Sequence, residues 1–231
     1  MEKLRNFATR KRDWGLPRAL HWELMNVLSK FGVFVHYVNV GADLREIVGE
    51  DKPVVAPQYD TRVACLRDLL PHIGGVPKLS RDFLEIAFSR GDLCVANFVG
   101  SQLVGFSFSS FKRARVTDQL DVIVPDGFRY GYKGWTHPDH RRQNLSRMRG
   151  YVRRKMIRGC HEQRSISYVA THNYASLLHS YRSPRLRSLR MGLCGWFTVF
   201  GYQVPFNSRH AKWVGFEFVR KEDLGRRQYV W

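Results

Sequence analysis

A short polar stretch between an aromatic run and a long basic segment has residue types suited to holding an anion. The stretch is Thr136–Ser146, and it follows the aromatic run Phe128–Trp135. The aromatic run has the composition of a strand and the segment after it has helical spacing, so the stretch falls at a helix N-terminus. The first amides of a helix lack internal partners, and the helix dipole is positive there. The chemistry predicted is binding of a phosphate-bearing ligand.

The chain as a whole is strongly basic. Its 231 residues include 38 Lys and Arg against 20 Asp and Glu, and 38 − 20 gives a formal charge of +18. Such a surface attracts polyanions: nucleic acid, anionic lipid headgroups, a phosphorylated cofactor or an acidic carrier protein. Hydrophobic residues at 44% and aromatic residues at 13% exclude a disordered chain. Length and composition therefore predict a basic, globular protein with a substantial core.

The segment after the polar turn combines an apolar stripe with many cations. The stripe has the spacing of one buried helical face and consists of Leu145, Met148, Val152 and Met156. The cations around it are Arg147, Arg149, Arg153, Arg154, Lys155 and Arg158. Two interpretations stay open: a solvated face, or a surface for cofactor phosphates, an acidic acyl-carrier protein or nucleic acid. Aromatic residues are not interleaved with these arginines in a base-stacking pattern, which weighs against nucleic acid.

Periodicity indicates which elements position the turn. A helix ending at Gly32 and a strand over Val33–Val40 form an N-terminal extension, residues 1–55, and residues 56–231 form the main domain. The main domain is expected to contain further helices and strands in chain order. These are a helix capped by Ser80, a hairpin of Leu93–Val99 and Leu103–Phe111, the strand Phe128–Trp135, a helix to about Arg158, and strands at Ser165–Ala170, Gly195–Tyr202 and Ala211–Val219. The fold class predicted is α/β or α+β, with a mixed central β-sheet flanked by helices.

The sequence gives no sign of a metal centre, a disulfide framework or a membrane span. The four cysteines are far apart and form no Cys-x-x-Cys pair. His137 and His140 flank the turn, but two histidines without a further ligand make a poor metal site. No apolar run reaches the length of a membrane span, and the charged N-terminus has no signal-peptide core. We expect a cytoplasmic protein without a bound metal.

The residues of the turn resemble the acyl-CoA motif of the GNAT acyltransferase superfamily. In that motif a strand ends at a proline and an Arg-x-x-Gly-x-Gly/Ala turn starts the next helix. Pro138 and Arg141 match, whereas Arg142, Asn144 and Ser146 stand at positions where glycine is common. Similarity extends over about residues 59 to 219, through the predicted hairpin, the Ser165–Asn173 segment and the last strands.

The resemblance implies a role for each matching position. Backbone N–H groups of Gly134, Trp135 and Thr136 would face the acyl carbonyl and the pantetheine amides. Other cofactor contacts implied are the pyrophosphate turn, Arg141, Arg142, Gln143, Asn144, Leu145 and Ser146, followed by Asn173 and Ser176. Asn173 can equally be the cap of its own helix. A tyrosine near the start of the next helix would protonate the leaving thiolate, and Tyr181 is the nearest candidate; Glu85 is the candidate base.

Three functions follow as hypotheses. The first is a GNAT-like N-acetyltransferase, which moves acetyl from acetyl-CoA to an amine of unknown identity by direct attack on the thioester. The second is a longer-chain acyltransferase whose donor is an acyl-CoA or an acyl-carrier protein, motivated by the +18 charge. The third is a GNAT-fold binding module for nucleic acid or a protein partner, motivated by the replaced glycines. The oligomeric state and the acceptor are not determined by the sequence.

Overall fold

The structure is a computed structural model that describes residues 2–43, 52–77, 79–158, 160–161, 164–174, 176–178 and 189–224. The chain forms two compact units, each discontinuous in sequence. A terminal unit comprises Met1–Gly41, Arg115–Ile123 and Tyr168–Trp231, and a central unit comprises Ala42–Ala114 and Val124–Ser167. The predicted division at residues 55 and 56 does not coincide with these units and stays a prediction about domains.

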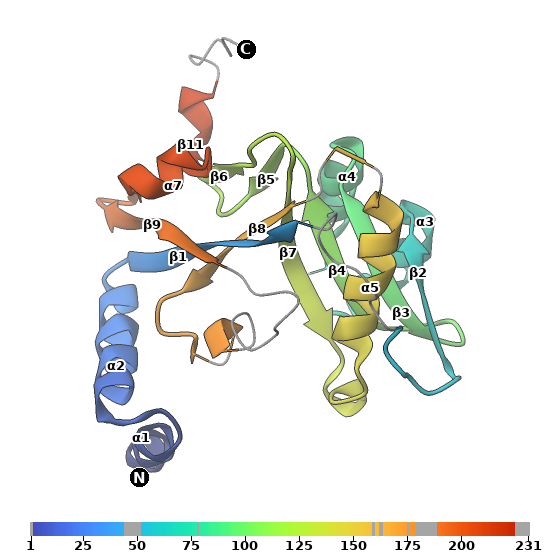
Figure 1. Ribbon diagram of the computed structural model, residues 1–231, viewed down its shortest axis with the longest axis horizontal. Coiled ribbons are helices and arrows are strands. Elements are labelled where there is room, and N and C mark those ends of the chain that lie inside the picture. Colours follow the sequence, from blue (N-terminus) through green and yellow to red (C-terminus); the bar gives the residue numbers. More distant parts are fainter. Residues whose placement is uncertain are drawn as a thin grey trace. The chain divides into compact units, whose positions relative to one another are not determined.

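The central unit is built on a mixed sheet (Figure 1). Its strands are β2 (Tyr59–Ala64), β3 (Leu93–Val99), β4 (Gln102–Ser110), β7 (Phe128–Thr136) and the first residues of β8 (Arg164–Ala170). The strand order is β8-β7-β4-β3-β2. Neighbouring strands are antiparallel, except that β7 and β8 are parallel. The β3–β4 hairpin confirms the strands predicted from alternating apolar residues.

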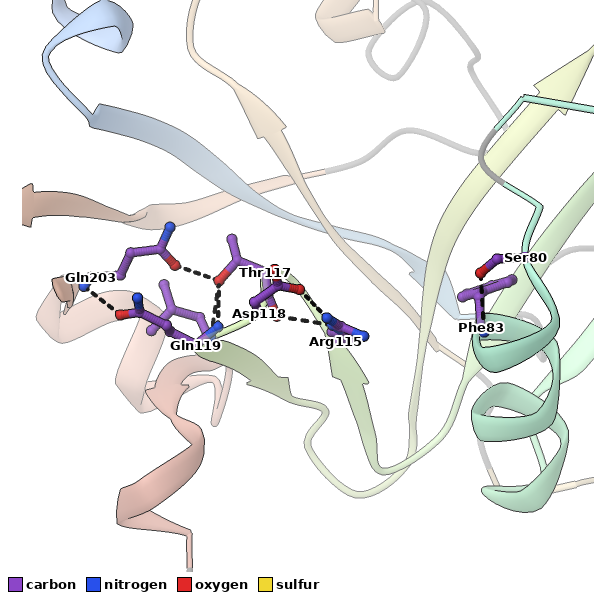
Figure 2. A network of polar contacts seen from close by, with 8 residues as sticks. Ser80, Phe83, Arg115, Thr117, Asp118, Gln119 and Gln203 are labelled. Atoms are coloured by element: carbon purple, nitrogen blue, oxygen red, sulfur yellow. Dashed lines mark hydrogen bonds and ion pairs between the residues drawn. The ribbon is translucent and has the colours of Figure 1, made fainter. Parts of the chain in front are cut away.

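Helices cover both faces of this sheet. On one face, α3 (Leu66–Leu69) and α4 (Arg81–Ser89) pack on an apolar core that includes Phe98, Phe106 and Phe108. The Ser80 hydroxyl caps α4 by accepting a hydrogen bond from the Phe83 N–H at 3.3 Å, as predicted (Figure 2). On the other face, α5 (Leu145–Ile157) lies against β2, β3 and β4 (Figure 1). Successive strand residues alternate between these two faces.

The terminal unit contains two N-terminal helices and several antiparallel strands. Helices α1 (Glu2–Trp14) and α2 (Leu16–Lys30) precede β1 (Val33–Asp43), and β1 pairs antiparallel with β9 (Leu189–Val199), which pairs with β10 (Tyr202–Asn207). Strands β6 (Leu120–Ile123) and β11 (Glu217–Arg220) form a second antiparallel pair, and β5 covers Arg113–Arg115.

Three side chains brace the turn between β9 and β10 (Figure 2). The Gln119 side chain donates to the Gly201 carbonyl at 2.8 Å and accepts from the Gln203 N–H at 2.8 Å, while Thr117 contacts the Gln203 side chain.

Two predictions for the C-terminal strands were wrong. The segment expected to be one strand over Ala211–Val219 contains the helix α7 (Arg209–Trp213) before β11. The physical reason is a helix cap, because the Ser208 hydroxyl accepts a hydrogen bond from the Ala211 N–H at 3.3 Å. The strand expected over Gly195–Tyr202 is interrupted by a tight turn at Phe200 and Gly201.

Candidate functional site

Strand β7 is bulged just before it reaches the predicted anion turn. Phe106 of β4 pairs with Trp135 and Phe108 pairs with Tyr132, so the single residue Ser107 lies opposite both Lys133 and Gly134. Lys133 has φ 47°, in the left-handed region that non-glycine residues seldom adopt. A bulge of this kind increases the local twist and redirects the strand end.

One edge of β7 is unpaired beyond its first residues. The parallel ladder between β7 and β8 runs from Phe128 opposite Arg164 to Tyr130 opposite Ile166. Among the residues that the structure describes, no further rung continues this ladder along Gly131–Thr136. Backbone N–H and C=O groups alternate between the two sides of a strand, so some of those along Gly134, Trp135 and Thr136 face this edge and are available to a ligand, while the others face β4.

Two non-glycine residues of the turn after β7 adopt the left-handed backbone conformation. Arg142 has φ 63° and Asn144 has φ 57°, so both adopt the left-handed conformation for which glycine is the usual residue. Alternation of left-handed and ordinary residues points successive N–H groups into one concavity, which suits an anion. The buried Leu145, 2% exposed, anchors the start of α5 beneath the turn.

The amides of this turn have no internal acceptors. Within the described chain, the N–H groups of Arg142, Gln143 and Asn144 donate to no backbone or side-chain acceptor, and the next two belong to the first turn of α5, where helical partners are missing. Asn144 occupies the N-cap position, yet its side chain makes no cap bond and donates instead to the Val54 carbonyl at 3.3 Å. A set of free N–H groups therefore lies at the positive end of a helix, which is the geometry that binds phosphate.

A segment distant in sequence braces the turn from outside. The Tyr59 hydroxyl lies 3.1 Å from His140 Nδ1, and the two rings meet edge to face. With the Asn144–Val54 bond, this contact fixes residues 52–59 across the start of α5. Sequence reasoning did not find Tyr59, because a lone tyrosine 81 residues from its partner leaves no local pattern.

The same segment and α5 line an open pocket of about 640 Å³. Its wall combines apolar side chains with two lysines. The lining residues are Lys52, Pro53, Val54, Val55, Ala56, Pro57, Tyr59, Asp60, Thr61, Met148, Tyr151, Val152 and Lys155.

Two arginines of α5 point into the protein, although the sequence suggested that the cations of this helix form a surface. Arg149, 3% exposed, donates to the side-chain oxygen of Asn97 and, at 2.9 Å, to the Thr136 hydroxyl. Arg153 donates to the hydroxyls of Ser109 at 3.1 Å and Ser107 at 3.5 Å. The interpretation of these charges as a solvated face is therefore wrong for Arg149, whose partners are neutral oxygens of the sheet.

Burial changes the acidity of these guanidinium groups. Desolvation, followed by repulsion from Arg153, lowers the pKa of Arg149 to about 10. The pKa of Arg153 falls to about 10 through burial and repulsion from Arg154, and that of the buried Arg129 falls to about 9 through burial and its arginine neighbours. All three remain cationic at neutral pH. Arg149 adds positive potential where β7 meets the turn, through its contact with Thr136, and within the described residues neither Arg149 nor Arg153 pairs with a carboxylate.

The remaining predicted residues are not all brought to this turn. Glu85 lies on the exposed side of α4, 3.4 Å from Arg81 in an ordinary helical ion pair. Asn173 and Ser176 belong to the terminal unit, where the Asn173 side chain accepts from the Ser176 N–H at 3.2 Å. Asn173 thus has the capping contact considered for it, while Tyr181 lies outside the described residues. The ligand and catalytic roles of all four stay predictions.

The described part of the chain contains neither of two simple patterns, a cluster of metal-binding side chains and a membrane-spanning helix. No group of three or more His, Cys, Asp or Glu side chains there could hold a metal ion. No helix within the described residues is both long and apolar enough to cross a bilayer.

Comparison with known proteins finds likenesses in structure only. No family model and no curated protein matches the chain. A Drosophila protein has a TM-score of 0.50 at 12% identity over 76% of this chain. A GCN5-related N-acetyltransferase from Kribbella flavida has a TM-score of 0.42 at 13% identity over 74% of this chain. A tandem GNAT protein from the clavulanic acid biosynthesis pathway has a TM-score of 0.46 at 9% identity over 81% of this chain.

The matches also differ in length. This chain spans 55% of the Drosophila protein, 63% of the Kribbella protein and 54% of the tandem protein. At identities of this order a structural likeness bears on the fold and not on a substrate. The solved structural neighbours of this mixed α/β chain thus include several GCN5-related N-acetyltransferases, one of them a tandem protein.

Proposed function

We propose that this protein is an acyl-CoA-dependent N-acyltransferase that moves an acetyl group from acetyl-CoA to an amine. The observation that carries the proposal is the set of free N–H groups over Arg142–Asn144 at the start of α5, formed by two non-glycine residues in the left-handed conformation. These groups suit the pyrophosphate of CoA. The unpaired edge of β7 ends at the same turn, so it can take the pantetheine amides in a strand-like contact.

The transfer needs few groups from the protein. A neutral acceptor amine attacks the thioester carbonyl, whose developing negative charge is stabilised by backbone N–H groups on the Gly134–Thr136 edge. The C–S bond then breaks, and the amide product and the CoA thiolate form. The amine loses one proton, for which Glu85 or water is the candidate base, and the thiolate gains one, for which Tyr181 is the candidate acid.

Calorimetry with three ligands tests the proposal and separates its rivals. We expect saturable binding of acetyl-CoA and free CoA, and acetyl transfer to a panel of amines by a thiol-release assay. Tighter binding and faster turnover with octanoyl-CoA would favour the longer-chain donor. Absence of saturable heat with all three ligands would leave the non-catalytic binding module.

A charge placed in the turn gives a sharper test. Asn144→Glu sets a carboxylate beside the expected phosphates, so acetyl-CoA binding should fall by at least a hundredfold while the fold is retained. Ile86→Glu is the matched control, because it adds the same charge to an exposed position of the same unit. Equal affinities of the two variants would place the pyrophosphate elsewhere.

A further inference from the structure

Helix α2 exposes an apolar face that the described residues of its own unit leave uncovered. Its members, which we call the α2 stripe, are Leu16, Leu20, Leu24 and Val27 of the helix and the C-cap residue Phe31, and their exposed fractions run from 46% for Leu16 to 73% for Phe31. At 100° per residue these positions fall within one face, with the buried Met25 on the opposite side of the helix and the buried Ala19 on a flank. A helix that is apolar on both sides has a second surface to cover.

The turn between β9 and β10 adds an aromatic ring to the same end of the unit. Phe200 is 97% exposed and has φ 48°, in a two-residue hairpin turn where Asn-Gly is the favoured pair. The Thr198 N–H donates to the Gly32 carbonyl at 3.0 Å, which ties this hairpin to the C-terminal end of α2. Phe200 therefore combines a strained backbone with a ring that packs against none of the described residues of its unit, as expected of a binding surface.

The spacing of the α2 stripe identifies the chemistry of its occupant. Leu20, Leu24, Val27 and Phe31 are separated by four, three and four residues, which is the spacing of a coiled-coil seam. Such a seam packs best against another helix with the same spacing. A second copy of this chain supplies one, and a two-fold axis makes the contact self-complementary.

We propose that the α2 stripe and Phe200 form the self-association surface of a symmetric homodimer, in which two α2 helices pack antiparallel. In this register Leu24 packs against the partner's Val27, and Leu20 packs against the partner's Phe31. Leu16 then extends beyond the end of the partner helix, where the partner's Phe200 covers it. One occupant thus accounts for both the stripe and the exposed aromatic ring.

Charges beside the stripe agree with this register. Glu23 and Lys30 lie on the same flank of α2, and the antiparallel pairing sets Glu23 opposite the partner's Lys30, twice per dimer. Glu23 also holds Arg10 at 2.7 Å, yet 42% of its side chain stays exposed. An anionic membrane surface fits less well, because a carboxylate beside the apolar face would oppose the lipid charge.

Sedimentation velocity of the full chain, over a range of protein concentrations, tests the dimer. The wild type should sediment as a dimer at micromolar concentration. Leu24→Glu places two unpaired carboxylates near the two-fold axis, so the dissociation constant should rise by at least about a hundredfold. Ile86→Glu is the matched control on α4 and should leave the dimer intact. A wild type that is monomeric at 100-fold higher concentration, or a Leu24→Glu dimer of unchanged affinity, would overturn the proposal.

A charge exchange tests the antiparallel register without depending on the apolar residues. Lys30→Glu sets like charges opposite each other and should weaken the dimer about tenfold at low salt. Adding Glu23→Lys to the same chain restores opposite charges and should recover most of the affinity. A monomer that instead sediments with phosphatidylserine vesicles, and loses this property in Leu24→Glu, would identify a membrane as the occupant and contradict the dimer.

Discussion

The two faces of the central sheet differ in the polarity of their side chains. On the α4 face, β3 and β4 contribute Phe98, Phe106 and Phe108, which are at most 2% exposed. On the α5 face, the polar side chains of Asn97, Ser107 and Ser109 meet Arg149 and Arg153, beside Gly105 and the buried Val95. The same strands therefore carry an apolar core on one side and a neutral polar layer holding buried cations on the other.

This difference in polarity indicates that one face supplies stability and the other positions the turn. Apolar burial on the α4 face supplies stability. Buried guanidinium groups with neutral partners supply little, because their desolvation offsets the hydrogen bonds that they form. Arg149 instead joins Asn97 on β3 to Thr136 at the end of β7, so it fixes the position where the anion turn begins. A Cβ at Gly105 would collide with this guanidinium and crowd the Asn97 side chain and the Trp135 carbonyl, so a larger residue there would displace Arg149.

The largest effect should come from breaking the apolar face. Phe108→Ala removes a fully buried ring that contacts Phe83, Phe88 and Tyr132, and it should lower the free energy of unfolding by about 3–5 kcal/mol. Urea denaturation followed by circular dichroism measures the loss. Val63→Ala, at a site 37% exposed on the edge strand β2, is the control and should cost less than about 1 kcal/mol. A comparable loss in both variants would remove the distinction between core and edge.

The terminal unit contains a buried histidine, whose side chain, unlike that of arginine, is readily neutral near pH 7. His36 stacks on Trp196 and meets Tyr168 edge-on, and burial, with a smaller contribution from His172, lowers its pKa from 6.5 to about 4. The unfolded chain therefore binds the proton more readily, so stability is complete above pH 6.5 and falls as the pH drops towards 4. Unfolding of the wild type should cost about 2 kcal/mol less at pH 5 than at pH 7.

The measurement is a pair of urea titrations at these two pH values, repeated on His36→Phe. The variant keeps an aromatic ring in the layer and has no proton to bind, so its stability should change less between pH 7 and pH 5. An equal pH dependence in both proteins would assign the acid sensitivity to other groups.

The sequence predicts the elements of the site better than their contacts. Alternation located the β3–β4 hairpin, the Ser80 cap preceded α4, and the aromatic run ended within a residue of β7. These are local signals, since each depends on neighbours in the chain. The α7 helix was missed because a five-residue helix has too few turns to show a period. Arg149 stands four residues after Leu145 and three before Val152, so helical spacing places it on the buried stripe of α5. Its polar partner Asn97 lies 52 residues away, so no pattern within α5 shows what that burial satisfies.

Arg149→Met tests whether the polar face positions the turn. Methionine has a similar length and no charge, so the lost desolvation cost offsets the lost hydrogen bonds and the unfolding free energy should change by less than about 1.5 kcal/mol. Release of Thr136 should nevertheless weaken acetyl-CoA binding by about tenfold, measured by calorimetry. Arg149→Lys keeps the charge but lacks the fork that reaches both acceptors, so its affinity should be intermediate. Unchanged affinity in Arg149→Met would limit the polar face to a packing role.

The smallest effect concerns the strained backbone of the turn itself. Arg142 has φ 63° and an exposed side chain, so Arg142→Gly removes the steric cost of the left-handed conformation and loses no packing. Glycine also increases the entropy of the unfolded chain, so the net gain in unfolding free energy should be only about 0.5 kcal/mol. Asn144→Gly is the matched variant, and its gain should be smaller because asparagine tolerates this conformation and donates to Val54.

If Arg142 also contacts phosphate, its replacement should reduce the salt dependence of acetyl-CoA affinity, whereas Asn144→Gly should leave that dependence unchanged. A stability loss in Arg142→Gly would mean that the arginine side chain, rather than the backbone, holds the turn.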